Sequence, residues 1–217
     1  MARVTHLEQI GNQFKLYYDD TRTAVAYPTQ GSIWFVGDPG GSIDPTPVDG
    51  DYAFPYGVGY ISDYFGLRED VGRWHEGTDF AGGPASYGNP IPSIAVGTVE
   101  LNEYYGAFGN AVIVNHGIVS GGTYDGYTLK TLSAHMISAG PVGVGGAVTL
   151  GQTIGYVNNT GSSFGSHLHQ ELHAIPPGGS MTNDYLNPNP APPSNRTAID
   201  IVLFMAEYNP TGVTIYP

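Results

Sequence analysis

The sequence predicts a mainly β protein whose core is an antiparallel β-sheet or a sandwich-like pair of sheets. The 217 residues include 32 Gly, 17 Pro and 16 Tyr, a composition that suits short strands joined by tight turns better than packed helices. Between Tyr52 and about Ile175 the chain alternates β-rich runs with Gly, Asn or Pro, and one face of such a sheet is expected to be buried. The runs are PSIAVGTVEL, NAVIVNHGI, YTLKTLSAHM, AVTLGQTIGYV and HLHQELHAI.

Small β elements are expected to flank this core. Residues 12–36 hold three β-type runs separated by the turn sequences DDT and PTQG. The following DPGGSIDPTPVDGD has no periodic apolar pattern and indicates a linker. Near the C-terminus, AIDIVLFMAEY predicts one more strand. The expected divisions are an N-terminal β unit at 1–37, a linker at 38–51, a main domain at 52–190 and a C-terminal extension at 191–217.

Charge and composition exclude several classes of partner and site. Lys and Arg number 7 against 19 Asp and Glu, and the net charge of −12 argues against a surface that binds nucleic acid or anionic membranes. Because Cys is absent, a metal would have to be bound by nitrogen and oxygen. The first twenty residues lack an apolar run of signal-peptide length, and the apolar stretch 201–206 is too short to span a bilayer. We therefore expect no secretion signal and no membrane insertion.

Two histidines in GSHLHQEL, His167 and His169, point to a possible shared ligand. Side chains alternate between the two faces of a strand, so these imidazoles are expected on one face. An H-x-H pair by itself is more often two structural histidines satisfied by hydrogen bonds. The pair therefore needs support from elsewhere in the chain.

The segment RWHEGTDFAGG offers that support through His75 and Asp79. Their spacing of four in a strand-like segment places both on one face, and Gly77 argues against the helix of an H-E-x-x-H site. Together with one histidine of the later pair they would form a three-ligand zinc site with an open fourth position. Glu76 would face the other way and is expected to be solvated or to support the site. His135 in TLSAHM, taken alone, is typical of a structural histidine.

Seven sequence blocks in order resemble the lysostaphin-type zinc endopeptidases, which cut peptide cross-links of bacterial peptidoglycan. The resemblance covers most of residues 52–175 and implies that 52–190 is a lysostaphin-like peptidase domain. The blocks are YAFPYG, SDYFGLR, RWHEGTDFAGG, GNPIPSIAVGTVE, GNAVIVNHG, SAHM and VTLGQTIGYVNNTGSSFGSHLHQEL.

The resemblance implies a role for each histidine of the site. His75 and Asp79 would bind Zn²⁺ through H-x-x-x-D, and His169 would be the third ligand. His135 and His167 would be the unligated catalytic histidines. Zinc activates water and polarises the scissile carbonyl, and nearby imidazoles orient the water and stabilise or protonate the tetrahedral species. Which histidine is the general base stays open at this point.

Other positions of the pattern bear on substrate and packing. His116 in VNHG matches a family position and is expected to be structural, whereas His173 and His6 have no expected catalytic role. Ser133 and Gln170 stand where the family often has aromatic residues. These two changes leave the substrate preference open, between a glycine bridge and a D-Ala to diamino-acid cross-link. Because every position needed for metal binding and proton transfer is filled, we expect an active enzyme.

The expected biological role is a bacteriophage tail-tip component that opens the host cell wall during genome entry. Peptidoglycan lies outside the cytoplasmic membrane, so a chain without a secretion signal needs another route. A free lysin gains from a basic surface, which a charge of −12 does not provide. We therefore expect the protein in the virion, with peptidoglycan and other tail proteins as partners and no nucleic acid. The alternatives are a phage endolysin and a non-catalytic structural or wall-binding tail protein.

Overall fold

The structure is a computed structural model of the 217-residue chain. It describes the backbone of four strands within residues 4–36, and residues 52–56, 60–68, 72–183 and 196–208 in full. The four N-terminal strands form an antiparallel sheet in chain order. The three runs predicted within 12–36 are confirmed as the last three strands, and one further strand precedes them. The strands are β1 (Val4–Ile10), β2 (Gln13–Tyr18), β3 (Thr23–Thr29) and β4 (Ser32–Val36). The predicted linker at 38–51 lies outside the described residues.

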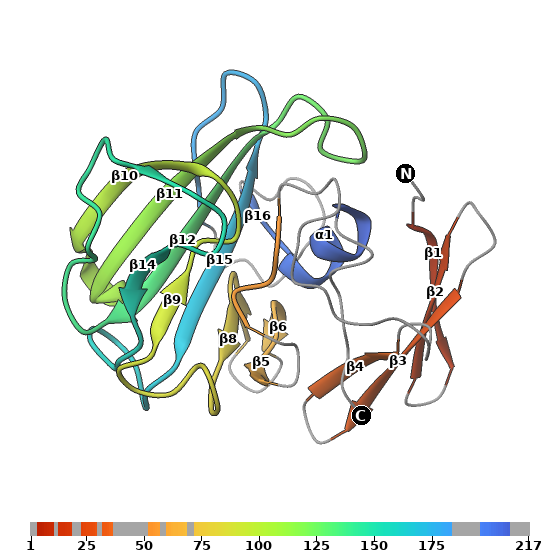
Figure 1. Ribbon diagram of the computed structural model, residues 1–217. Coiled ribbons are helices and arrows are strands. Elements are labelled where there is room, and N and C mark those ends of the chain that lie inside the picture. The colour runs from red at the N-terminus through yellow and green to blue at the C-terminus, as the bar shows by residue number, and fades with distance from the viewer. Residues whose placement is uncertain are drawn as a thin grey trace.

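One antiparallel sheet forms the body of the rest of the chain (Figure 1). Its strand order is β13-β10-β11-β12-β15-β8-β5, and every pairing along this path is antiparallel. This confirms the mainly β prediction. The strands are β5 (Ile61–Asp63), β8 (Thr78–Phe80), β10 (Gly97–Tyr104), β11 (Asn110–Ile118), β12 (Thr128–Met136), β13 (Ala147–Val148) and β15 (Leu168–Ile175).

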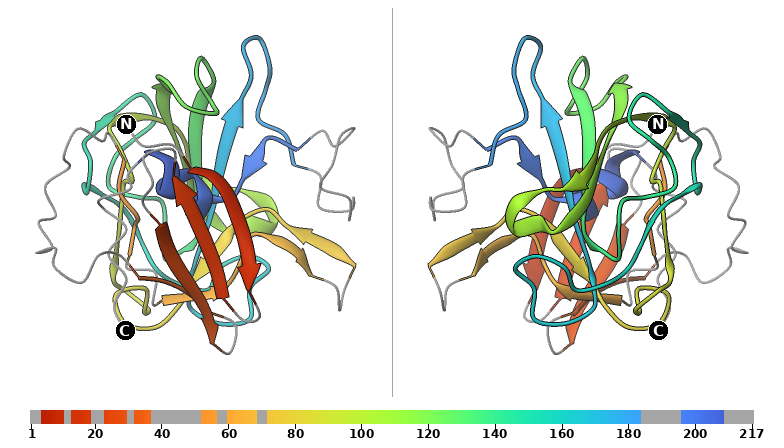
Figure 2. Two further views of the ribbon diagram at one scale, coloured as in Figure 1. Left: turned by 90° about the vertical axis from the view of Figure 1, so that its right-hand side faces the viewer. Right: turned by 90° about the vertical axis from the view of Figure 1, so that its left-hand side faces the viewer.

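Two smaller strand pairs accompany the main sheet. The ribbon of β6 (Gly66–Arg68) and β7 (Arg73–His75) extends away from the main sheet (Figure 2). β9 (Pro90–Pro92) pairs with β14 (Thr153–Tyr156), and a 3-10 turn spans Gly106–Phe108. The ribbon is important for the site because its last residue is His75.

The two faces of the main sheet bury different side chains. The larger apolar cluster includes Leu168 and Leu172 of β15. A smaller cluster on the other face contains Leu132 and Ala134, with Phe108 packed against it. Every residue of β15 is buried, so its polar side chains must find partners inside the protein. Strand alternation places His169, Glu171 and His173 on the face opposite the two leucines.

The strand predicted over residues 198–208 is wrong for most of its length. Only β16 (Ala198–Ile199) is extended, and Ile201–Tyr208 forms the helix α1. The Asp200 side chain begins this helix, because its Oδ1 accepts hydrogen bonds from the backbone N–H groups of Val202 at 2.7 Å and Leu203 at 3.3 Å. A continuous apolar run shows no period of two, so by itself it does not distinguish a buried helix from a buried strand.

Helix α1 packs on the core of the main domain, so the described part of the C-terminal extension, residues 196–208, belongs to that structure. The ring of Phe204 meets that of Tyr52 edge-on, with centroids 5.1 Å apart. The Tyr208 hydroxyl donates to the Gly121 carbonyl at 2.9 Å. None of the helices in the described parts of the chain is both long and apolar enough to cross a membrane.

Candidate metal centre

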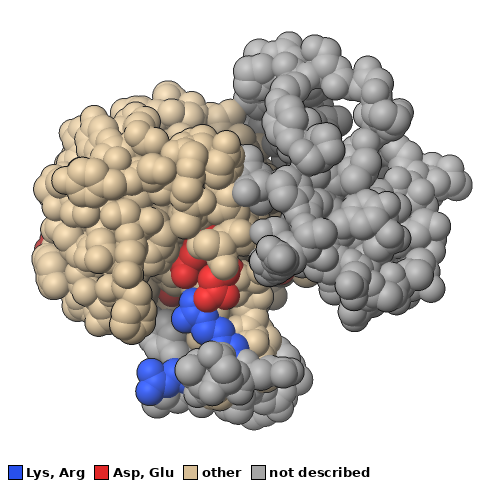
Figure 3. All heavy atoms as spheres, turned by 90° about the horizontal axis from the view of Figure 1, so that it is seen from below, with Lys and Arg blue, Asp and Glu red and all other residues tan. Residues whose placement is uncertain are grey.

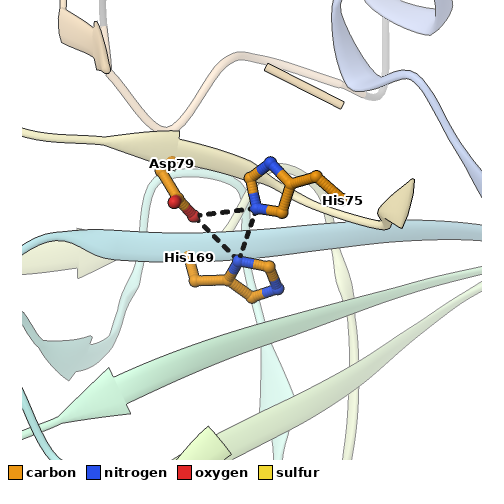
Figure 4. Close-up of side chains that lie close together, drawn as sticks. All are labelled: His75, Asp79 and His169. Carbon is orange, nitrogen blue, oxygen red and sulfur yellow. Dashed lines mark hydrogen bonds and ion pairs between the residues drawn. The ribbon is translucent and has the colours of Figure 1, made fainter. Parts of the chain in front are cut away.

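His75 and Asp79, which are four residues apart, meet the distant His169 at one edge of β15. His75 ends β7, Asp79 lies in β8, and the β8–β15 register places Asp79 directly opposite His169. Their facing atoms are His75 Nε2, Asp79 Oδ1 and His169 Nδ1, with separations of 3.1 Å between the nitrogens, 3.2 Å from His75 to Asp79 and 2.8 Å from His169 to Asp79 (Figure 4). Among the described residues, these three side chains form a cluster whose ligand atoms lie within 4.8 Å of one another, close enough to bind one metal ion.

The local route from His75 to Asp79 differs from the single strand that their spacing predicts. β7 ends at His75 and β8 begins at Thr78, with Glu76 and Gly77 between the two strands. A Cβ atom at Gly77 would overlap the imidazole of His169. Glycine is therefore required here so that the segment can pass close to the third ligand.

The outer nitrogen of each imidazole is held by an acceptor that points away from the centre. His75 Nδ1 donates to the Tyr64 carbonyl at 2.7 Å, and His169 Nε2 donates to Glu171 Oε1 at 3.3 Å. These contacts leave His75 Nε2 and His169 Nδ1 as the lone-pair atoms that face Asp79. Acceptors placed in this way typically fix the tautomer of a metal-bound histidine.

The donor set fits zinc. Tetrahedral zinc with bonds of about 2.0–2.1 Å places its ligand atoms about 3.3 Å apart. The observed separations of 2.8, 3.1 and 3.2 Å are close to that value. Two nitrogens and one carboxylate oxygen also form the three-ligand set that leaves a fourth position free for a reacting group.

The charges around the site favour a bound cation. Burial would raise the pKa of Asp79, but hydrogen bonds from His167, His169 and His75 outweigh it and hold that pKa well below its usual range. Burial would lower the pKa of His169, but the carboxylates of Asp79 and Glu171 outweigh it and raise that pKa to about 9. The ionised Asp79 therefore attracts a positive charge at this position, which is a proton on His169 when no metal is bound.

The other oxygen of Asp79 is held by an arginine. Arg68 Nη2 donates to Asp79 Oδ2 at 3.4 Å and also pairs with Asp63. Asp79 thus directs Oδ1 toward the two imidazoles and Oδ2 toward the guanidinium of β6. This fixes the orientation of its carboxylate.

His135 and His167 lie together beside the three facing ligands. The ring centroid of His135 is 5.0 Å from that of His167 and 5.8 Å from that of His169. His135 Nδ1 donates to the Thr160 carbonyl at 2.8 Å, and His167 Nδ1 donates to the Gly165 carbonyl at 2.7 Å. His167 Nε2 is 3.5 Å from Asp79 Oδ1. Both histidines therefore have an oriented ring whose Nε2 is not bonded to a backbone carbonyl.

The backbone and the pKa of His135 are unusual. His135 has a φ of 59°, and among the described residues it is the one residue other than glycine with a positive φ. L-residues rarely adopt this conformation, and where they do it is often at a functional site. Burial lowers the pKa of His135 to about 4, although the Thr160 carbonyl opposes this shift. His135 is therefore neutral at pH 7. The pKa of His167 is raised instead, because Asp79 outweighs the effect of burial.

The five site residues line an open cleft with a volume of about 1370 Å³. Its lining also includes Arg68, Arg73, Trp74, Phe108 and the loop 162–167. Phe164 in that loop is fully exposed. Seen from below, the described surface has one place where acidic and basic side chains adjoin, and most of the remaining surface in that view is uncharged (Figure 3).

Glu171 is a functional candidate that the sequence reasoning missed. It is buried, and its Oε2 lies 2.9 Å from both His173 Nε2 and Asn183 Nδ2. Burial would raise the pKa of Glu171, but hydrogen bonds from His169 and His173 outweigh it and keep the carboxylate ionised. The period of two in HLHQELH places Glu171 on the face of His169, and that signal was available from the sequence.

The structure also places the remaining predicted residues. His116 has the expected structural contacts, with Nδ1 2.8 Å from the Val96 carbonyl and Nε2 2.9 Å from Thr131 Oγ1. Gln170 donates through Nε2 to Ser133 Oγ at 3.1 Å, and the two residues are paired across β12 and β15. They face the core side of the sheet together, so neither replaces an aromatic residue of the cleft.

The comparison with known proteins identifies the family. The model of peptidase family M23 matches residues 73–188, which include both metal-binding segments. The chain belongs to peptidase family M23. His75, Asp79 and His169 form the zinc site of this M23 metallopeptidase domain.

Two known proteins are similar to this M23 domain in sequence. The DD-carboxypeptidase/endopeptidase Mpg of Neisseria meningitidis is 35% identical over 115 residues, which are 51% of this chain and 24% of that protein. The peptidoglycan DD-endopeptidase ShyA of Vibrio cholerae is 36% identical over 98 residues, which are 45% of this chain and 20% of that protein. The chain thus matches less than a quarter of either relative.

Lysostaphin from Staphylococcus simulans is one solved structure that this chain resembles. Its structure superposes with a TM-score of 0.50 and 25% identity over 77% of this chain and 58% of that one. The expectation of a lysostaphin-type fold is confirmed.

Proposed function

We propose that this M23 domain is a zinc-dependent endopeptidase that hydrolyses the peptide cross-links of bacterial peptidoglycan. The observation that supports this most directly is the pair His135 and His167, whose rings lie 5.0 Å apart beside the zinc ligands in an open cleft. A non-catalytic protein that keeps the fold for structure or wall binding has no use for two oriented imidazoles there. Two M23 relatives are named DD-carboxypeptidase/endopeptidase and peptidoglycan DD-endopeptidase, and both names agree with this activity.

The proposed chemistry divides the work between the metal and the two histidines. Zinc, when bound, supplies Lewis acidity that activates water and polarises the scissile carbonyl. His135 is neutral at pH 7 and its Nδ1 is engaged, so its Nε2 accepts a proton from the attacking water. His167, whose pKa is raised by Asp79 in the metal-free protein, is given the role of donating a hydrogen bond, then a proton, to the departing amine. This assigns the base and the acid that the sequence leaves open.

The cleft favours a substrate with a free carboxylate. Arg73 lines it next to Arg68, whose guanidinium is already paired with Asp63 and Asp79. A D-Ala to diamino-acid cross-link carries a carboxylate beside the scissile bond, whereas a glycine bridge carries none. Arginine binds carboxylates through paired, charge-assisted hydrogen bonds. We therefore propose the diamino-acid cross-link as the substrate, which fits the DD-endopeptidase names of the relatives.

The test compares purified wild type with His169→Ala and His167→Ala on isolated walls and on muropeptides of known cross-link type. The wild type should hold zinc and release new amino termini from diamino-acid cross-links. His169→Ala should lose both zinc and activity. His167→Ala should keep zinc and lose activity by about 10²–10⁴-fold. Wild-type protein that contains zinc and releases no amino termini from either cross-link type would refute the proposal.

We also propose that the enzyme works as part of a phage tail and acts at the host cell wall. The net charge of −12 disfavours free adsorption to an anionic envelope, and tethering to a particle removes the need for it. The four-stranded sheet β1–β4 lies outside the M23 match and provides an assembly surface for other tail proteins. Mass spectrometry of purified virions tests this role: the chain should be present, and absence from virions with appearance at lysis would favour an endolysin.

A further inference from the structure

The C-terminal segment that precedes α1 returns to the edge of β15 that also carries β8. β16 pairs with Leu172 and His173 of β15, while β8 pairs with Leu168, His169 and Gln170. β8 and β16 therefore lie end to end along one strand (Figure 1). The residues just before β16, Arg196 and Thr197, are thus brought close to the zinc-binding strands, although the M23 match ends at residue 188.

Arg196 contacts both sequence neighbours of the zinc ligand His75. Its Nε donates to Glu76 Oε1 at 3.1 Å, and its guanidinium lies 4.4 Å from the centroid of the Trp74 ring. Only 4% of the Arg196 side chain and none of the Glu76 side chain is exposed. A buried ion pair is strongly coupled, because removing one partner leaves the other charge without compensation. The backbone on either side of His75 is therefore held from the C-terminal segment.

Thr197 reaches the other imidazole ligand through two intermediates. Its Oγ1 lies 2.8 Å from His173 Nδ1, and His173 Nε2 lies 2.9 Å from Glu171 Oε2. Glu171 Oε1 is the acceptor for the outer nitrogen of His169, at 3.3 Å. The backbone of Thr197 is fixed at the same time, because its carbonyl accepts from Ala174 N and its N–H donates to the Thr182 carbonyl, both at 3.0 Å.

We infer that Arg196 and Thr197 are positioning residues for the zinc ligands, one acting on His75 through Glu76 and Trp74, the other on His169 through His173 and Glu171. Through these contacts the segment fixes the positions of the two imidazoles, and therefore their separation, before the metal binds. Contacts of this kind typically change metal affinity by about 10–100-fold when they are removed. The inference depends on the zinc site and not on the substrate, so zinc affinity is the readout rather than turnover.

The experiment measures the zinc dissociation constant of the full chain by chelator competition, together with the thermal unfolding midpoint of the metal-free protein. Arg196→Gln and Thr197→Val should each weaken zinc binding about tenfold or more. Arg196→Gln combined with Glu76→Gln should weaken it no more than Arg196→Gln alone, because both changes remove the same contact.

Glu207→Gln is the matched control. Its carboxylate accepts hydrogen bonds from Thr123 N at 2.7 Å and Thr123 Oγ1 at 3.0 Å, so it anchors the same extension to a loop away from the zinc site. It should lower the unfolding midpoint and leave zinc affinity unchanged. If Arg196→Gln does not fold, zinc affinity is measured on Arg196→Lys and Thr197→Val instead. Zinc affinities equal to wild type in variants that only melt earlier, as Glu207→Gln does, would overturn the inference whether or not the enzyme cleaves peptidoglycan.

Discussion

Asp79 and His169 face each other across the antiparallel strands β8 and β15, and their side chains meet at 2.8 Å. The register of these two strands therefore sets the geometry of the zinc site. A slip of one residue would turn His169 to the core side of the sheet. The short β8 is held in register by its neighbour β5 and by the close approach of Gly77 to the His169 ring.

Gly77→Ala should weaken zinc binding at least tenfold, because the added methyl group overlaps the His169 imidazole and forces it away from Asp79. Chelator competition on the purified variant measures the effect. Gly143→Ala is the control, because a Cβ there meets no atom within 4 Å and the backbone is not left-handed. Unchanged zinc affinity in Gly77→Ala would mean that the turn can shift without moving His169.

Zinc affinity should rise with pH up to about 9. The pKa of His169 is raised to about 9 in the metal-free protein, so below that pH its ring carries a proton that zinc must displace. The apparent affinity should therefore fall by about tenfold for each pH unit below 9, within the range in which Asp79 stays ionised. Calorimetric titration at pH 7 in buffers of different ionisation heat should detect about one proton released per zinc. No proton release at pH 7 would contradict the raised pKa.

Ser133→Ala should lower the free energy of unfolding by about 1–3 kcal/mol, because it leaves the buried Gln170 amide without its hydrogen-bond acceptor. Among the described residues, Gln170 Oε1 already has no partner. The double variant Ser133→Ala/Gln170→Leu should recover most of the loss, since it removes both polar groups. Urea unfolding of both variants measures these values. A double variant less stable than Ser133→Ala would show that Gln170 has another role.

Phe164→Ala should raise KM for cross-linked muropeptides and leave zinc affinity and stability unchanged. The Phe164 ring lines the cleft but is fully exposed, so its removal affects substrate contact and not core packing. Steady-state kinetics on a defined muropeptide measures the effect. Val144→Ala is the control, since Val144 is also highly exposed and does not line the cleft. Equal KM values for the two variants would exclude Phe164 from substrate binding.

Local patterns in the sequence were sufficient for the fold class, and together with the family resemblance they gave the zinc ligands. The β-rich runs became β10 to β15, H-x-x-x-D with H-x-H indicated His75, Asp79 and one histidine of the pair, and the family resemblance selected His169. The period of two within β15 also separated the polar face of His169 from the leucine face. The catalytic roles of His135 and His167 stay a prediction, although the structure brings both rings to the site.

Other features depend on contacts between segments that are distant in the sequence. The apolar run 201–206 reads equally as strand or helix, and its packing against Tyr52 and the cap at Asp200 decided for α1. Glu76 was expected to be solvated or to support the site, and it is buried because Arg196 returns from 120 residues away to pair with it.

The sequence by itself determined His75, Asp79 and the H-x-H pair as candidate zinc ligands and placed the pair on one strand face, because this follows from residue type and the alternation of neighbouring side chains. The family resemblance then selected His169 from the pair. The tertiary structure alone decided how these residues are held. The β8–β15 register, the Glu171 acceptor behind His169 and the Arg196–Glu76 pair depend on long-range packing and burial. No local sequence period encodes those contacts.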